Sequence, residues 1–132
     1  MSSRGEILLA WLKDAILDRE RTAGNAAAEA GATWREDPFL YGVRDQKNAL
    51  VAKSRENRAA SIVHIAAVDP ESVLRRCAAD RKLLELHAAK LHSCPAPGHT
   101  GDLDEWIHFG WNTTCPVVEM LAEGYGWTGG DR

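Results

Sequence analysis

The sequence predicts one mostly helical α+β domain over residues 1–132, with three longer helices, a small β-hairpin and a short C-terminal helix. Apolar residues recur at helical spacing in three stretches, and strand-forming residues flank a polar turn between the first two. The composition agrees, because 132 residues with 45% hydrophobic and 27% charged side chains are typical of a single globular domain.

The first predicted helix covers residues 3–30. Its apolar positions are Ile7, Leu8, Trp11, Leu12, Ala15 and Ile16. Gly31 is the expected stop, because glycine readily adopts the left-handed conformation that ends helices. The apolar stripe is expected to pack in the core, with a homodimer contact as the alternative.

The hairpin is expected between Trp34 and Val51. Trp34, Tyr41 and Val43 precede the polar turn RDQKN, and Leu50 and Val51 follow it.

Two further helices are expected over residues 55–67 and 70–92, separated by Asp69-Pro70. Aspartate is a favoured N-cap and proline fits the first helical position, so this pair marks a helix start. The segment EWIHFGWNTT reads as a short strand or irregular structure. A final short helix begins at Pro116 and ends by Gly124.

Net charge and cysteine content limit the binding partners and the cellular compartment that we expect. A net charge of −3 provides no general attraction to nucleic acid or anionic membranes. The N-terminal apolar run is too short for a membrane span and lacks a signal-peptide cleavage site. Three cysteines fit a disulfide framework poorly, so we expect a cytoplasmic protein.

A zinc site is the strongest chemical prediction. Cys94 and His99 flank a Pro-Ala-Pro-Gly turn, and Cys115 lies before Pro116 at a helix start. Zinc takes four nitrogen or sulfur ligands, commonly a close pair and others from a helix. His87 is the favoured fourth ligand; His92 and then His108 are the alternatives.

The competing interpretation is that Cys94 and Cys115 are free thiols, or a disulfide in an oxidising compartment, and that His99 lies on the surface. Cys77 falls on an apolar helical stripe and is expected to be a buried hydrophobic residue. A bound metal is expected to be structural. Asp102 or Glu105 could serve as a general base in a hydrolase, but the His-Glu-x-x-His signature is absent.

Two partner-binding surfaces are candidates. Trp127 lies in a glycine-rich tail where an exposed aromatic could anchor a partner. A basic segment could contact phosphates, although a solvated surface is favoured; its cations are Arg44, Lys47, Lys53, Arg55 and Arg58.

The chain resembles a family of small actinobacterial and phage proteins with a domain of unknown function. The resemblance is carried by LLAWLKDAILDRERTA, by HIAAVDPESVLRRCAADRKLLELH and by CPVVEMLAEGYG. It implies that His87, Cys94, His99 and Cys115 form the metal-like set, with His99 where the family often has a second cysteine. The long polar hairpin segment and the short tail also depart from the family pattern.

From these observations we expect a non-enzymatic accessory protein of a phage or an actinobacterium, with a structural zinc ion. It would act in the cytoplasm of a bacterial host cell, by binding a host or phage protein and no membrane. The alternatives are a nucleic-acid-binding module that uses residues 44–58 and a small zinc hydrolase.

Overall fold

The computed structural model describes residues 3–55, 59–88, 91–95, 106–110 and 113–129. Backbone contacts group the chain into a central unit, Asp18–Ala78, and a terminal unit that combines Met1–Leu17 with Ala79–Arg132. The single domain expected from the sequence stays a prediction.

The described residues form four helices and five strands, which confirms a mostly helical α+β fold. In chain order they are α1 (Arg4–Ala30), β1 (Trp34–Asp37), β2 (Gly42–Asp45), β3 (Leu50–Lys53), α2 (Ala59–Ala67), α3 (Pro70–His87), β4 (His92–Pro95), β5 (Trp106–Phe109) and α4 (Pro116–Gly124). Among them, no helix has the length and apolar character needed to cross a membrane.

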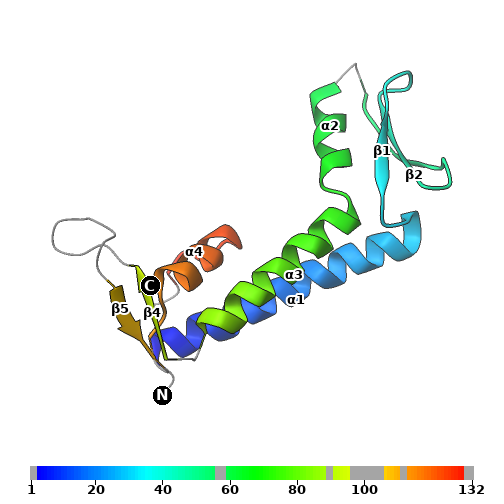
Figure 1. Cartoon of the computed structure of the whole chain (residues 1–132). Coiled ribbons are helices and arrows are strands. Elements are labelled where there is room, and N and C mark those ends of the chain that lie inside the picture. Colours follow the sequence, from blue (N-terminus) through cyan, green and yellow to red (C-terminus); the bar gives the residue numbers. More distant parts are fainter. Residues whose placement is uncertain (1–2, 56–58, 89–90, 96–105, 111–112, 130–132) are drawn as a thin grey trace. The chain divides into compact units, whose positions relative to one another are not determined.

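The central unit contains an antiparallel sheet with the order β1-β2-β3. Figure 1 shows α2 beside this sheet, and α2 packs against β1 and β2. Val43 and Ile62 are buried, at 0% and 4% exposure, and belong to this apolar layer. The predicted hairpin is therefore present, as the β2–β3 pair.

The sheet has one strand more than predicted. Residues 38–41 form a turn that separates β1 from β2, because the Asp37 carboxylate accepts hydrogen bonds from the backbone N–H groups of Phe39 and Leu40. Such a side-chain-capped turn reverses the chain and allows Trp34–Asp37 to pair with Gly42–Asp45. The sequence pattern predicts a single strand segment before the RDQKN turn.

The predicted start of α3 is confirmed. One carboxylate oxygen of Asp69 accepts a hydrogen bond from the Ser72 N–H at 2.9 Å, and the other accepts one from the Trp34 N–H at 3.1 Å. Gly31 ends α1 with a φ of 75°, as expected for a left-handed helix stop. Asp69 thus links the start of a helix to the start of the sheet.

The core of the terminal unit is formed by one face of α1 together with α3 and α4. Its most buried apolar side chains are Leu8, Leu12, Ile16, Leu84, Val118 and Ala122, all exposed by 5% or less. A partly buried hydrogen bond of 2.7 Å joins the Tyr125 hydroxyl to the Asp80 carboxylate. Arg4 at the start of α1 forms an ion pair with Glu119 of α4 at 2.7 Å.

The predicted length of α3 is wrong. The helix ends at His87, and residues 92–95 instead form β4, which pairs antiparallel with β5. This pairing requires extended backbone, which overrides the helical spacing of Ala88 and Leu91; Leu91 is 78% exposed. Of the two readings of EWIHFGWNTT, a short strand is the correct one for residues 106–109.

Candidate metal centre

The candidate centre begins with the alternation of β4. Successive strand residues point to opposite faces, so His92 and Cys94 share one face while Ser93 points away from it. Cys94 is 3% exposed, and the Nε2 nitrogen of His92 is buried. On the other face, the Ser93 hydroxyl and His108 Nδ1 form an exposed hydrogen bond of 2.9 Å.

His87 contributes a third donor from the last residue of α3. Its Nδ1 lies 3.2 Å from Cys94 Sγ and 3.5 Å from Cys115 Sγ. Its ring contacts the His92 ring edge-on, with a centroid separation of 5.0 Å. His87 therefore occupies the middle of the group.

Cys115 contributes the fourth donor from the start of α4. It is the extended N-cap residue, with φ −81° and ψ 167°, and Pro116 follows it at the first helical position. Its thiol forms no cap hydrogen bond and is fully buried. The start of α4 therefore delivers a buried sulfur donor to the group.

Together the Nδ1 or Nε2 and Sγ atoms of His87, His92, Cys94 and Cys115 all lie within 4.8 Å of one another. A tetrahedral zinc ion with ordinary bond lengths requires N···S separations of about 3.6 Å and an S···S separation of about 3.8 Å. The two N···S distances at His87, 3.2 and 3.5 Å, are close to this requirement. This group, which we call the His–Cys cluster, is the right size for a metal ion such as zinc.

The protonation states of the cluster argue against a thiolate–imidazolium pair. Burial raises the pKa of the Cys94 thiol, and the adjacent Cys115 raises it further. Burial lowers the pKa of His87, and neighbouring His92 contributes in the same direction. A catalytic cysteine needs the opposite shift, toward a lower thiol pKa. A metal ion would itself displace the thiol protons and bind a neutral imidazole.

The structure brings three of the four predicted ligands together: His87, Cys94 and Cys115. His92, ranked second to His87 for the helical ligand, joins them. His99 lies outside the described residues, as do Asp102 and Glu105. The sequence signal for His92 was its His-x-Cys spacing to Cys94, which places both side chains on one face once the segment is a strand.

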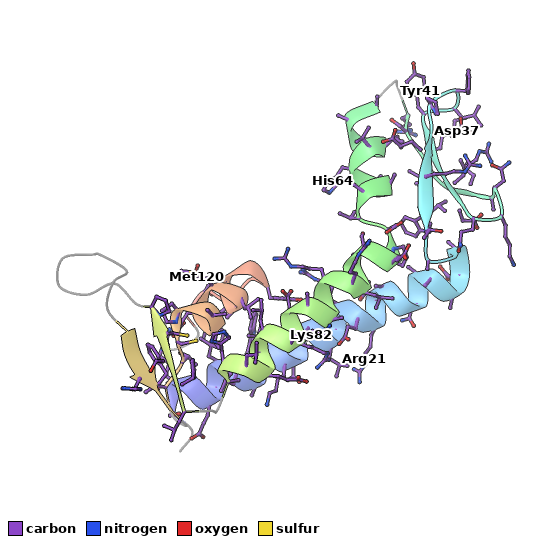
Figure 2. All side chains as sticks on the ribbon, in the orientation of Figure 1. Arg21, Asp37, Tyr41, His64, Lys82 and Met120 are labelled. Carbon is purple, nitrogen blue, oxygen red and sulfur yellow. The ribbon has the colours of Figure 1, made fainter. Side chains whose placement is uncertain are left out.

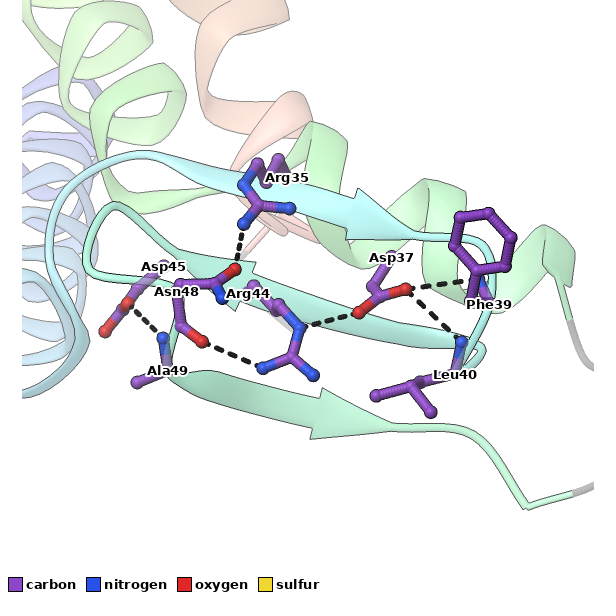
Figure 3. Close-up of polar contacts among 8 residues, drawn as sticks. All are labelled: Arg35, Asp37, Phe39, Leu40, Arg44, Asp45, Asn48 and Ala49. Carbon is purple, nitrogen blue, oxygen red and sulfur yellow. Dashed lines mark hydrogen bonds and ion pairs between the residues drawn. The ribbon is translucent and has the colours of Figure 1, made fainter.

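The predicted partner-binding residues lie elsewhere. Arg44 is bound within the sheet, to the Asp37 carboxylate and the Asn48 carbonyl oxygen (Figure 3). Lys47, Lys53 and Arg55 are exposed, and Arg58 is outside the described residues.

Trp127 is partly buried rather than fully exposed. Its ring packs edge-on against Trp11 at a centroid distance of 5.2 Å. Part of this aromatic surface is therefore already used inside the terminal unit.

Residues 6–126 match the model of a family described as a family of unknown function (DUF6221). The match includes all four members of the His–Cys cluster and the whole three-stranded sheet, and it confirms the predicted resemblance to a domain of unknown function. No curated protein and no solved structure matches the chain.

Proposed function

The chain belongs to this family of unknown function, and we propose that it is a non-enzymatic interaction protein whose terminal unit is held together by a structural zinc ion. The observation that carries the proposal is the His–Cys cluster, in which four donors lie within 4.8 Å of one another. Its members come from the end of α3, from β4 and from the start of α4, so an ion bound there would tie three elements together.

The donor set favours zinc over magnesium and calcium. Two thiolates and two imidazoles are typical ligands of tetrahedral zinc, whereas magnesium and calcium prefer oxygen ligands. Both cysteines are buried, and both histidines are partly buried. This environment shields the metal–ligand bonds from water.

A structural role follows from the number of protein donors. Catalytic zinc sites keep one coordination position for water, and four protein ligands fill a tetrahedral shell. The raised pKa of Cys94 also disfavours direct nucleophilic catalysis by this thiol. The cluster therefore supports a role in stability rather than in turnover.

Protein binding is the activity that we assign to the stabilised fold. The resemblance to actinobacterial and phage proteins suggests a bacterial host or phage protein as the partner. Nucleic acid is less well supported, because the guanidinium of Arg44 is bound to Asp37 inside the sheet. A phosphate would have to displace this ion pair.

Elemental analysis of the purified chain tests the metal assignment. We expect one zinc per wild-type chain and a clear loss of zinc in Cys115→Ala. Cys77→Ala is the matched control, because Cys77 is also fully buried but lies outside the cluster. A zinc-free wild type, or a Cys115→Ala variant that keeps its zinc, would overturn the assignment.

The fourth ligand is tested by a second pair of variants. We expect His92→Ala to lose zinc and His99→Ala to keep it. His64→Ala controls for the loss of an imidazole, because His64 projects from the side of α2 away from the sheet (Figure 2). Zinc loss only in His99→Ala would assign the site to the ligand set predicted from the sequence.

A further inference from the structure

The turn between β1 and β2 exposes three consecutive large apolar side chains. Phe39 is 92% exposed, Leu40 41% and Tyr41 37%. Leu50, which is 47% exposed, lies beside them over Gly42: a Cβ atom built on Gly42 would come within 2.9 Å of Leu50 Cδ1. These four residues form what we call the turn surface.

Polar groups of the sheet hold the turn in one conformation (Figure 3). One Asp37 oxygen accepts the Phe39 and Leu40 N–H groups at 3.1 and 3.3 Å. The other oxygen accepts a 2.6 Å hydrogen bond from Arg44 Nε. Phe39 therefore lies on a turn that these hydrogen bonds fix, so the turn loses less conformational entropy when a partner binds Phe39.

The backbone conformation of Tyr41 is a second indication that the turn is a binding site. Its φ is 48°, in the left-handed region that is unfavourable for residues other than glycine, asparagine and aspartate. A hydrogen bond of 2.8 Å from the Ser54 N–H to the Tyr41 carbonyl oxygen holds this residue against β3. Strained backbone of this kind clusters at binding sites. Figure 2 shows Asp37 and Tyr41 at the same end of the sheet.

Among the described residues, exposed cations lie beside the turn surface. Register places Asp37, Gly42 and Lys53 in one row across the sheet, and exposed Arg55 follows two residues later. Asp37 is neutralised by its ion pair with Arg44. Exposed Glu36 lies in the row of the buried Val43, on the opposite face.

We propose that the turn surface docks a partner protein, which supplies an apolar pocket for Phe39 and carboxylates that face Lys53 and Arg55. This inference rests on the proposed interaction function and names the surface that performs it. A single buried aromatic side chain is a common energetic centre of a protein interface, and flanking charges guide the encounter.

A membrane or a nucleic acid fits the turn surface less well than a protein does. The two cations beside the turn surface, Lys53 and Arg55, are fewer than the roughly four to eight that recruit an anionic membrane surface. Single-stranded nucleic acid stacks on aromatic side chains, but two of the four residues of the turn surface, Leu40 and Leu50, are aliphatic and offer no stacking face. A protein pocket uses both the apolar turn and the adjacent cations.

The test is photo-crosslinking with benzoylphenylalanine placed at position 39 of the full chain in its native cells. The control places the same residue at exposed position 47, in the turn at the other end of the sheet. We expect one protein adduct from position 39 that position 47 does not give. No protein adduct, or an adduct with a second copy of the chain, would overturn the proposal.

Binding of that purified crosslinked protein then measures the surface. We expect Phe39→Ala to weaken binding by about 30-fold or more, the threshold of an interface hot spot. Lys53→Glu should slow association, and Val63→Ala should change nothing, since Val63 is an exposed apolar residue of α2 outside the surface. Unchanged binding of Phe39→Ala would overturn the proposal.

Two controls separate this outcome from the metal assignment. Phe39→Ala should keep the zinc content and melting temperature of the wild type, because the side chain is 92% exposed. Vesicles of phosphatidylcholine and phosphatidylserine should not bind the wild-type chain. Phe39-dependent vesicle binding would reassign the turn to a membrane surface and leave the zinc result untouched.

Discussion

The His–Cys cluster predicts that zinc stabilises the fold and that Cys115, but not Cys77, is needed for this effect. Both cysteines are fully buried, so each change to alanine removes a buried sulfur atom and has a similar cost without metal, roughly 1 to 3 kcal/mol. The rise in Tm on adding zinc, measured for each variant against its own metal-free state, therefore separates loss of the metal from loss of the sulfur atom. This shared background makes the pair a controlled comparison.

The size of the response follows from linkage between binding and folding. Free zinc at about 100 times its dissociation constant stabilises the native state by about 2.7 kcal/mol. Loss of a ligand that weakens binding by about 100-fold reduces this gain to about 0.4 kcal/mol. The unfolding entropy of a 132-residue chain is about 0.28 kcal/mol/K, so the zinc-dependent rise in Tm should be about 10 °C for the wild type and Cys77→Ala. For Cys115→Ala it should be about 1 °C.

Thermal unfolding followed by circular dichroism, with zinc or with a chelator, measures these shifts. Cobalt provides an independent readout, because its absorption reports tetrahedral thiolate coordination directly. An equal zinc-dependent rise in Tm for Cys115→Ala and Cys77→Ala would refute the reasoning. A wild-type Tm that does not change with zinc would refute it as well.

Two further predictions concern the central unit. Asp69→Ala should lower the free energy of unfolding by about 1 to 3 kcal/mol, because it removes both the N-cap of α3 and the hydrogen bond from the Trp34 N–H. Asp69→Asn should lose mainly the hydrogen bond from the Trp34 N–H. Burial raises the pKa of Asp69, but the N–H donors outweigh this and hold it below its ordinary value of about 3.9. The stabilisation of the fold by ionised Asp69 should therefore be complete above about pH 4 and should disappear as pH falls through the lower folded-state pKa. Urea unfolding at several pH values measures this. A pH-independent difference in unfolding free energy between wild type and Asp69→Asn would contradict it. Gly42→Ala should lower the free energy of unfolding by about 1 to 3 kcal/mol. Adding Leu50→Ala should not restore this stability, because the new Cβ would also lie 3.0 Å from the Ala52 carbonyl oxygen. Full recovery in the double variant would show that only the contact with the Leu50 side chain matters.

The helices could be predicted because their signals are local. The spacing of apolar residues in α1, the Asp69-Pro70 start of α3 and the Cys115-Pro116 start of α4 each lie within a few residues. The end of α3 could not be predicted this way. Ala88 and Leu91 continue the helical spacing, and only pairing with residues 106–109 identifies β4 as a strand.

The same distinction governs the site. Cys94 and Cys115 stood out because they flank prolines at element boundaries, and His87 because of its place near the end of a helix. His92 joins the cluster through the alternation of β4, a strand in a segment whose apolar spacing predicts a helix. The separate strand β1 was missed because Trp34–Asp37 carries three charged residues and no apolar alternation.

The β4–β5 pairing offers a practical opportunity for engineering. Pro95 lies opposite Trp106, so the chain leaves and re-enters the hairpin at neighbouring positions. If His92 completes the metal shell, nothing in the ligand set depends on the length of the connection between these residues. A reporter peptide or small binding domain could then be spliced into residues 96–105, and retained zinc would show at once that the graft is tolerated.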